Sequence, residues 1–329
     1  MSNNGEAKLD IRVIANYFGK PLPYLQLWLD SCGYNQEITW IFFTDIDMSV
    51  FDVPHNIKVV RTSFEATKAR FQKTFPYPIR YEKAWDFCAF RPTFGTVFAD
   101  ELGAAEYWGW CDCDLIFGNL SICVDACKNG FDKVMPKGHF SLIKNDSSLN
   151  TFVLEHPLTR KAVALNETGL PCFDEEAFSS EILPEFKAKQ FNSIPFVNTA
   201  CRYGNYLLDD TLELFRVLEI DQSVKRRFPF VATWSDGKMY AYFAMPNKSV
   251  RKIEIAYFHF FRRELIPNIC RLVLGKTYLI RPNEIVEYDG HDLSWPEIKR
   301  MNKFRMHWKY FMQRLNWQTI SAKIRNYIG

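Results

Sequence analysis

Two aspartates, Asp112 and Asp114, stand one residue apart at the end of a short aromatic run. Residues 106–111 before them are typical of a buried strand, which would deliver both carboxylates to its C-terminal end, where open α/β sheets bind ligands. Two carboxylates this close repel each other unless a cation lies between them. Oxygen ligands suit Mg²⁺ or Mn²⁺, which keep open positions for a diphosphate. The pattern therefore predicts a divalent metal site for a nucleotide-diphospho-sugar, with the metal offsetting charge on the leaving diphosphate.

The same motif allows two other interpretations. A bare D-x-D also occurs in turns and helix caps, but the aromatic strand before it and the apolar residues 115–117 after it favour the metal site. Four nearby cysteines offer a zinc site, yet the one, nine and three residues between them are unlike the spacing of common structural zinc sites. We interpret them as small packing residues of the core. They are Cys111, Cys113, Cys123 and Cys127.

The elements around the motif are those of an α/β sheet. Residues 9–15, 39–43 and 57–61 are short apolar runs that predict strands, and residues 22–32 carry apolar side chains at helical spacing before Gly33. This strand–helix–strand–strand order predicts neighbouring parallel strands. The later predictions are helices at 81–90, 94–102 and 120–128 and strands at 132–135, 138–144, 241–243 and 253–260.

The composition is that of a globular chain with a substantial core. Of 329 residues, 47% are hydrophobic and 16% aromatic, which excludes a disordered or low-complexity chain. The apolar runs are far shorter than the roughly 18–20 residues of a membrane span, and the polar N-terminus lacks the core of a signal peptide. Nine cysteines without an even framework agree with a reducing compartment, so we expect a cytoplasmic protein. The formal charge of +3 is too balanced to indicate a nucleic-acid partner.

Beyond the motif, the chain resembles the GT-A fold glycosyltransferases, and more narrowly a family of such enzymes from polysaccharide-synthesis loci. The matching stretches cover most of residues 10–264, and the D-x-D stretch at 107–120 is the most specific of them. They are IANYFGKPLPYLQLWLDSC, IFFTD, YEKAWDFCAFRPTFG, YWGWCDCDLIFGNL, GHFSLIKN, FDEEAFS and AYFHFFRRE. The resemblance implies an α/β fold of the GT-A (Rossmann-like) type, a mixed central sheet flanked by helices, with a UDP-sugar as donor substrate.

The resemblance also implies metal ligands and nucleotide contacts. Asp114 would be the main metal ligand, Asp112 would contact the metal or the donor ribose, and His259 would complete the metal site. His259 lies in an aromatic run, so a packed core histidine is the alternative. The resemblance also implies a set of residues around the nucleotide. They lie after the first two predicted strands, in the stretch 81–95, in the D-x-D motif and directly after His259. They are Asn16, Tyr17, Phe18, Gly19, Asp45, Lys83, Asp86, Asp112, Arg262 and Arg263.

Three sets of these residues have a specific role in the nucleotide pocket that the resemblance implies. Residues 16–19 would form its first wall, where a glycine lets the backbone approach a ligand closely, and Asp45 would accept a hydrogen bond from uracil or ribose. Arg262 and Arg263 would clamp the diphosphate. Where the family pattern has Lys-Arg, this sequence has Arg-Arg, which keeps the charge but not the same geometry.

Three acidic residues also fit ordinary structural roles. Asp86 stands three residues after Lys83, so the two would border base and phosphate or form a plain helical ion pair. Asp174 and Glu175 are candidate catalytic residues, because an inverting transferase needs a carboxylate to take the proton of the acceptor hydroxyl. The alternative for both is the start of a helix, where acids are favoured. Inversion and retention both stay open.

We divide the chain into residues 1–265, the nucleotide-sugar-binding catalytic domain, and residues 266–329, a helical, basic C-terminal extension. Between 296 and 329 eight Lys or Arg face one acid, and apolar side chains recur every three to four positions from 301 to 315. This pattern is typical of a helix on an anionic membrane surface, and it equally fits a helix docked on the catalytic domain, which we favour. Membrane contact would place the protein peripherally at the inner face of a membrane.

The function predicted is that of a metal-dependent glycosyltransferase, which moves a sugar from a nucleotide-diphospho-sugar to a glycan or lipid-linked glycan acceptor in polysaccharide synthesis. Two other functions stay open. A sugar nucleotidyltransferase also uses acidic metal ligands, but it usually opens with a glycine-rich phosphate loop, which residues 16–24 lack. A non-catalytic sugar- or partner-binding module of the same fold would not need both Asp112 and Asp114.

Overall fold

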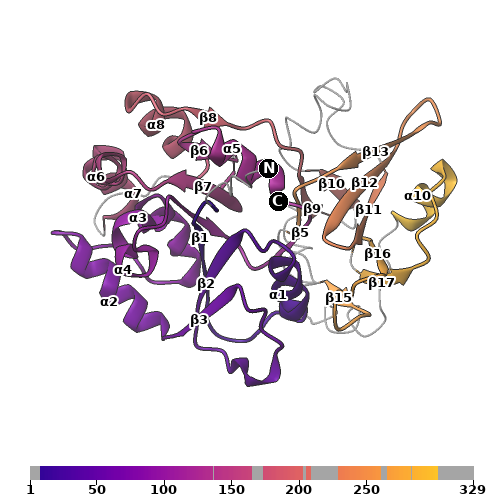
Figure 1. The fold of residues 1–329 in the computed structure, drawn as a ribbon, viewed down its shortest axis with the longest axis horizontal. Helices are drawn as coiled ribbons and strands as arrows, with labels where there is room; N and C mark the ends of the chain where they lie inside the picture. Colours follow the sequence, from indigo (N-terminus) through magenta and orange to yellow (C-terminus); the bar gives the residue numbers. More distant parts are fainter. Residues whose placement is uncertain are drawn as a thin grey trace, which may run out of the picture.

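Three β-sheets, the first of them flanked by helices, make up the described part of the chain (Figure 1). The computed structural model describes residues 8–135, 137–164, 173–202, 205–208, 229–260, 265–282 and 284–302. Two sequence predictions lie outside these residues: the Arg262–Arg263 clamp, and the tail from residue 303 onward with its membrane or docking helix.

The first sheet contains the parallel strands that the sequence predicts. Its strand order is β3-β2-β1-β4-β7-β6-β8, with β3, β2, β1 and β4 parallel and β7 antiparallel to β4. β2 and β4 are almost continuously apolar because both of their faces are buried, whereas the edge strand β3 exposes Lys58 and Arg61. The strands are β1 (Ile11–Tyr17), β2 (Ile38–Thr44), β3 (Ile57–Arg61), β4 (Tyr107–Cys111), β6 (Lys133–Val134), β7 (Phe140–Lys144) and β8 (Gln190–Phe191).

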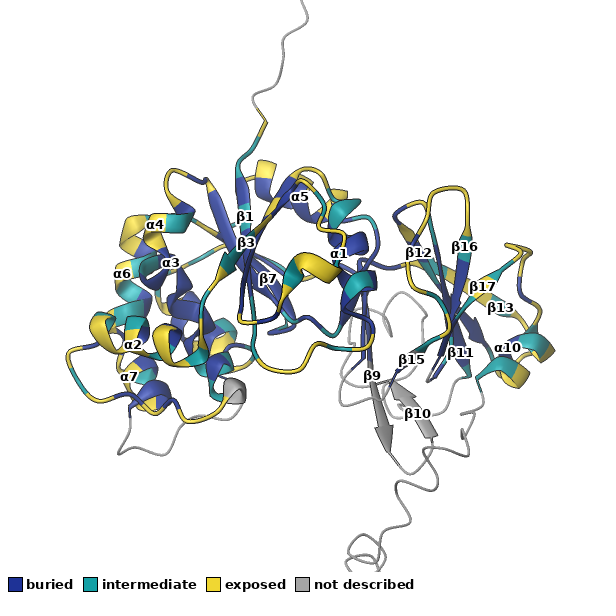
Figure 2. Cartoon of the chain, turned by 90° about the horizontal axis from the view of Figure 1, so that it is seen from below, coloured by how far each residue is buried: buried dark blue, intermediate teal, exposed yellow. Residues whose placement is uncertain are grey.

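Helices cover both faces of this sheet, so successive residues of one strand belong to different cores (Figure 2). Val13 of β1 packs in one core with Trp28, whereas Ile14 packs in the other with Phe71 and Phe94. The mixed α/β fold with flanking helices is thereby confirmed. The helices are α1 (Leu25–Gly33), α2 (Phe64–Thr74), α3 (Phe94–Val97), α4 (Ala99–Leu102), α5 (Ser121–Lys128), α6 (Ser147–Glu155), α7 (Pro157–Val163) and α8 (Leu183–Glu185).

Two further sheets follow the first. A four-stranded sheet has the order β10-β9-β14-β5, and a six-stranded sheet has the order β13-β12-β11-β16-β17-β15. The indole N–H of Trp234 in β11 donates to the carbonyl of Phe117 in β5 at 3.0 Å, which ties the two sheets together. The strands are β5 (Leu115–Phe117), β9 (Val197–Arg202), β10 (Asn205–Leu208), β11 (Phe230–Ser235), β12 (Lys238–Ala244), β13 (Val250–Glu254), β14 (Tyr257–His259), β15 (Ile266–Pro267), β16 (Thr277–Ile280) and β17 (Glu284–Tyr288).

The helical character expected for residues 266–329 is wrong for residues 266–267, 277–280 and 284–288, which form the strands β15, β16 and β17. β16 pairs with β11 and β17. Tyr278 and Ile280 face one hydrophobic core and Leu279 faces another, the period-two burial of a strand. The helix begins only at α10 (Trp295–Met301), which packs on β12 and β11. The division of the chain into two domains stays a prediction.

The helix expected at 81–90 is a 3-10 helix shifted to Ala84–Thr93, and it includes Pro92.

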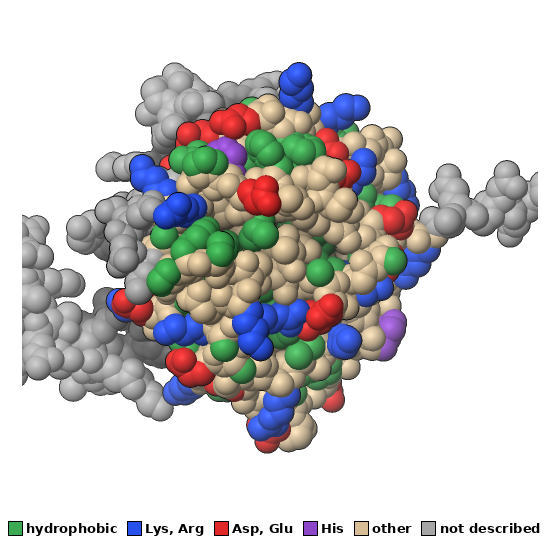
Figure 3. Space-filling view, turned by 90° about the vertical axis from the view of Figure 1, so that its left-hand side faces the viewer, with side chains coloured by type: hydrophobic (Ala, Val, Ile, Leu, Met, Phe, Trp, Pro, Cys, Tyr) green, Lys and Arg blue, Asp and Glu red, His purple; other side chains and the backbone are tan. Residues whose placement is uncertain are grey.

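Among the described helices, none combines the length and the apolar character that crossing a membrane requires. On the face shown in Figure 3, which lies at the left of Figure 1, Lys and Arg are interspersed with Asp and Glu among the described residues. The charge of this face is therefore mixed, in keeping with 41 basic and 38 acidic residues overall.

Candidate active site

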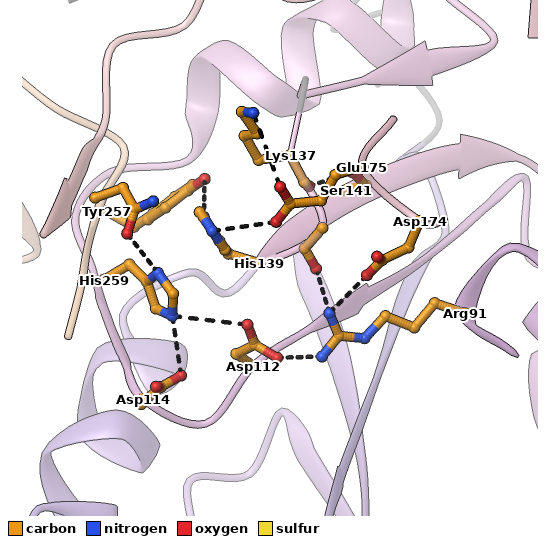
Figure 4. Close-up of polar contacts among 12 residues, drawn as sticks. Arg91, Asp112, Asp114, Lys137, His139, Ser141, Asp174, Glu175, Tyr257 and His259 are labelled. Atoms are coloured by element: carbon orange, nitrogen blue, oxygen red, sulfur yellow. Dashed lines mark hydrogen bonds and ion pairs between the residues drawn. The ribbon is translucent and has the colours of Figure 1, made fainter. Parts of the chain in front are cut away.

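The two aspartates of the motif lie in the turn between β4 and β5. The N–H of Asp112 donates to the carbonyl of His139 at 2.8 Å, and the carbonyl of Asp114 accepts from the N–H of Phe260 at 2.9 Å. β14 runs antiparallel to β5, with His259 opposite Leu115, so the register of this pair carries His259 to the motif. Nε2 of His259 lies 3.3 Å from Oδ1 of Asp114 and 3.7 Å from Oδ2 of Asp112 (Figure 4).

These three side chains fit a divalent metal ion. Their candidate ligand atoms all lie within 4.8 Å of one another. Oδ1 of Asp112 accepts a hydrogen bond from the guanidinium of Arg91. The other oxygen, Oδ2, is therefore the one that faces His259. Two carboxylate oxygens with one imidazole nitrogen suit Mn²⁺ well, and Mg²⁺ less well because Mg²⁺ prefers oxygen ligands alone.

Arg91 is a residue of this site that the sequence did not indicate. It lies in the 3-10 helix Ala84–Thr93 and is 9% exposed. One guanidinium nitrogen donates to Asp174 at 2.9 Å and to the carbonyl of Gly138 at 2.7 Å, and the other bonds Asp112. Arg91 thus links the D-x-D turn to the second acidic pair. The one sequence signal for Arg91 is its place in the stretch 81–95, which also contains Lys83 and Asp86.

Asp174 and Glu175 come together with the motif, but in different surroundings. The side chain of Asp174 is 4% exposed and is engaged by Arg91, whereas that of Glu175 is 22% exposed. Glu175 lies 3.4 Å from Nε2 of His139 and 3.8 Å from Nζ of Lys137. A Cβ on Gly138 would stand 2.4 Å from Oδ2 of Asp174, so this position has no room for a side chain.

The charges of the cluster are set by burial and by one another. Burial raises the pKa of Asp112 to about 6, although Arg91 opposes the shift. Burial also acts on Asp114 and His259, but their mutual attraction outweighs it, so the pKa of Asp114 is lowered and that of His259 is raised. Burial, then the neighbouring Asp174, raises the pKa of Glu175. Asp114 is therefore the carboxylate of the motif that keeps its charge most readily.

The residues expected to line the nucleotide lie at the ends of β1 and β2. The N–H of Gly19 donates to Oδ1 of Asp45 at 2.7 Å, which joins the two loops. Gly19 has φ +92°, and a Cβ there would meet nothing within 4 Å. The hydroxyl of Tyr17 donates to the carbonyl of Lys20 at 3.1 Å, and burial, followed by its neighbours Cys113 and Asp114, raises its pKa. Phe18 packs edge-on against Phe64.

Asn16 has an unused acceptor. Among the described residues its buried Oδ1 has no hydrogen-bond partner. A buried polar atom without a partner is costly unless a ligand or water supplies one. Asn16 therefore remains a suitable contact for a ligand that donates a hydrogen bond.

Lys83 and Asp86 are placed at the start of the 3-10 helix that carries Arg91. Oδ2 of Asp86 accepts the N–H groups of Glu82 and Lys83, each at 2.9 Å, and Lys83 is exposed. Asp86 thus closes the start of the helix, while contact of this pair with base or phosphate stays a prediction. The four cysteines near the motif are buried and pack in the core beside α5, as interpreted from their spacing.

Comparisons with known proteins give one family and several distant structures. The model described as "Family of unknown function (DUF6625)" matches residues 13–289. Among curated proteins, none matches this sequence. Similar solved structures include mouse xyloside xylosyltransferase 1, with 9% identity, 45% of this chain and 72% of that chain covered, and a TM-score of 0.31.

Two further similar structures are also glycosyltransferases. One is the glycosyltransferase GlyE of Streptococcus pneumoniae TIGR4, with 10% sequence identity and a TM-score of 0.33. The match covers 56% of this chain and 45% of the GlyE chain. A glycosyltransferase involved in the glycosylation of the major capsid of PBCV-1 has 9% identity, covers 57% of this chain and 85% of its own, and also has a TM-score of 0.33.

Proposed function

The chain belongs to the family of unknown function whose model matches residues 13–289, and within it we propose that this protein is a metal-dependent glycosyltransferase. It would transfer a sugar from a nucleotide-diphospho-sugar, with UDP as the first nucleotide to test, to a glycan or lipid-linked glycan in polysaccharide synthesis. The observation that carries the proposal is the convergence of Asp112, Asp114 and His259 beside a second acidic pair.

The metal-binding half of the site would receive the diphosphate. Asp112, Asp114 and His259 would hold Mn²⁺ or Mg²⁺, which when bound offsets the charge of the leaving diphosphate. Asn16 and Asp45 would bind the nucleoside, since Asn16 has an unused buried acceptor and the second oxygen of Asp45 is not needed by Gly19. Tyr17, Phe18 and Gly19 would complete this wall, and Arg262 with Arg263 would clamp the diphosphate.

The acidic half would face the reacting sugar. The carboxylate of Glu175 is partly exposed, whereas that of Asp174 is buried in an ion pair with Arg91. In an inverting transfer the bond from the anomeric carbon to the diphosphate breaks while the acceptor oxygen bonds that carbon, and Glu175 would take the acceptor proton. In a retaining transfer Glu175 would instead lie beside the anomeric carbon. In both cases Asp174 acts through Arg91 as a positioning residue.

Calorimetry with UDP, with and without Mn²⁺, tests the proposal on the wild type and on Asp114→Asn. We expect metal-dependent binding that Asp114→Asn abolishes and that the matched surface variant Asp125→Asn leaves unchanged, because Asp125 is exposed on α5. A screen of UDP-sugars should then give metal-dependent release of UDP.

Other outcomes identify other functions. Absence of UDP, GDP and CMP binding in the wild type would contradict the proposal. Release of pyrophosphate from a nucleoside triphosphate would indicate a nucleotidyltransferase. Metal-dependent binding of nucleotide-sugars without turnover on any glycan acceptor would indicate a non-catalytic binding module.

A further inference from the structure

The two ring nitrogens of His259 face different partners. Nε2 lies 3.3 Å from Asp114 and 3.7 Å from Asp112, and Nδ1 lies 2.8 Å from Oδ1 of Asn198. We propose that Asn198 is a positioning residue that keeps the proton of His259 on Nδ1, so that Nε2 presents its lone pair to the metal. The inference rests on the proposed metal site and assigns a role to a residue that the D-x-D pattern does not include.

The chemistry of a neutral imidazole requires such a partner. One ring nitrogen of neutral histidine carries a proton and the other is an acceptor, and only the acceptor nitrogen can bind a metal. Histidines that bind metals usually donate their remaining N–H to a second residue, which fixes both tautomer and ring orientation. At His259 an amide oxygen occupies the position that would receive this N–H.

Strand pairing places Asn198 there. β14 lies between β5 and β9, with His259 opposite Leu115 on one side and opposite Asn198 on the other. Asn198 is 7% exposed and His259 is 2% exposed, so water cannot readily replace their hydrogen bond. The same backbone register thus supplies the histidine to the carboxylates and the amide to the histidine.

His139 restricts the ring of His259 from a third direction. The two imidazole centroids are 3.9 Å apart and the rings are inclined by 31°. His139 is held in turn by two contacts (Figure 4). Its Nε2 lies 3.4 Å from Oε1 of Glu175, and its Nδ1 lies 3.4 Å from the hydroxyl oxygen of Tyr257. With a packed ring on its face and an amide at Nδ1, His259 can direct only Nε2 toward the carboxylates.

Titration with Mn²⁺ at one fixed pH tests the role of Asn198. Asn198→Leu has a similar volume but no acceptor, and we expect it to weaken Mn²⁺ binding by about 10–100-fold. Asn198→Asp keeps an acceptor oxygen and should bind Mn²⁺ nearly as the wild type does. The matched control is Asn56→Leu, since Asn56 is 9% exposed and its amide bonds three backbone carbonyls far from the motif in sequence.

The outcomes separate a positioning role from a merely structural one. Equal Mn²⁺ affinity in Asn198→Leu and the wild type would overturn the inference, even if the variant melts at a lower temperature as Asn56→Leu should. A wild type that does not bind Mn²⁺ would instead contradict the proposed metal site itself.

A second measurement needs no variant at Asn198 and so does not depend on its folding. The wild type, labelled with ¹⁵N in its imidazole rings and loaded with diamagnetic Zn²⁺, gives a long-range ¹H–¹⁵N spectrum that distinguishes the tautomers. His259, assigned by its loss in His259→Gln, should show a protonated Nδ1 and a metal-bound Nε2. A protonated Nε2 would overturn the inference.

Discussion

The two halves of the candidate site are held in place by different kinds of contact. Asp112, Asp114 and His259 are placed by backbone pairing, because β14 pairs with β5 directly after the motif. Asp174 and Glu175 are placed by side chains, above all by the guanidinium of Arg91, and by the missing Cβ of Gly138. The first arrangement rests on backbone hydrogen bonds, including those of the Asp112 N–H and the Asp114 carbonyl, whereas the second depends on a few side-chain atoms.

This difference predicts how each half responds to substitution. Exchanging a side chain of the metal-binding half should remove a ligand but leave the others where they are, since the strands remain paired. Exchanging Arg91 or Gly138 should displace the acidic half as a whole.

The largest effect is expected from Glu175→Gln. If Glu175 contacts the reacting sugar, losing its charge should lower kcat by about 10²–10⁴-fold. The melting temperature and the Mn²⁺ and UDP affinities should stay near those of the wild type, because Glu175 is partly exposed. Steady-state kinetics with the UDP-sugar found in the donor screen measure this. Asp174→Asn is the comparison, and it should lower stability as well, since it weakens the pair with Arg91. Turnover close to wild type in Glu175→Gln would remove Glu175 from the chemistry.

Arg91→Met should destabilise the fold and displace the acidic half. Removing one member of a buried ion pair costs about 3–5 kcal/mol, because the partner charge stays buried. The matched control is Arg70→Met, which breaks a two-point contact with Glu101 that is more exposed, at 29% and 17%, and should cost about 1 kcal/mol or less. Urea unfolding of both variants measures the difference. An equal loss of unfolding free energy in the two variants would show that the contacts of Arg91 stabilise the fold no more than the more exposed contact of Arg70 does.

Gly138→Ala should reduce activity more than stability. Its Cβ would stand 2.8 Å from Cγ of both Asp174 and Glu175, so the carboxylates must move. Overpacking of this kind costs about 1–3 kcal/mol of stability. Gly33→Ala provides the control, because its Cβ would lie 2.7 Å from Cγ of Pro54, away from both acids. A fully active Gly138→Ala would show that the acidic pair need not be placed so closely.

The most gradual effect, spread over several pH units, concerns Lys133, a fully buried lysine of β6 beside the acidic half. Burial lowers its pKa to about 7, although Asp174 and Glu175 oppose the shift. Between pH 7 and the ordinary lysine pKa of 10.5, the unfolded chain therefore binds a proton that the folded chain does not. The free energy of unfolding should rise with pH across this window, by up to about 1.4 kcal/mol per pH unit relative to Lys133→Met. Urea unfolding at pH 7, 8 and 9 checks this, and parallel pH profiles would refute it.

The sequence was most informative where neighbours in the chain are also neighbours in the fold. The strands at 9–15, 39–43 and 57–61 and the two aspartates after β4 follow from local apolar runs, and the structure contains them. The strands of 266–288 were expected to be helical, because their alternation becomes evident only when two cores lie against opposite faces of one sheet.

Long-range side-chain partners were out of reach for the opposite reason. Arg91 is a single basic residue before a proline in an aromatic run, and its partners stand 21, 47 and 83 positions away. Asn198 meets His259 across 61 residues through strand register alone. No local spacing identifies Arg91 or Asn198 as a residue of the site. His259 could be identified from the sequence, but only through the family resemblance.

In the proposed site, Asp112, Asp114 and His259 together hold a divalent ion that receives the diphosphate. Crystals grown with Mn²⁺ and UDP, with data collected at the manganese absorption edge, test it most directly. We expect one anomalous peak within coordination distance of all three side chains, with the UDP diphosphate bound to it. A peak elsewhere, or UDP bound without metal at this site, would contradict it.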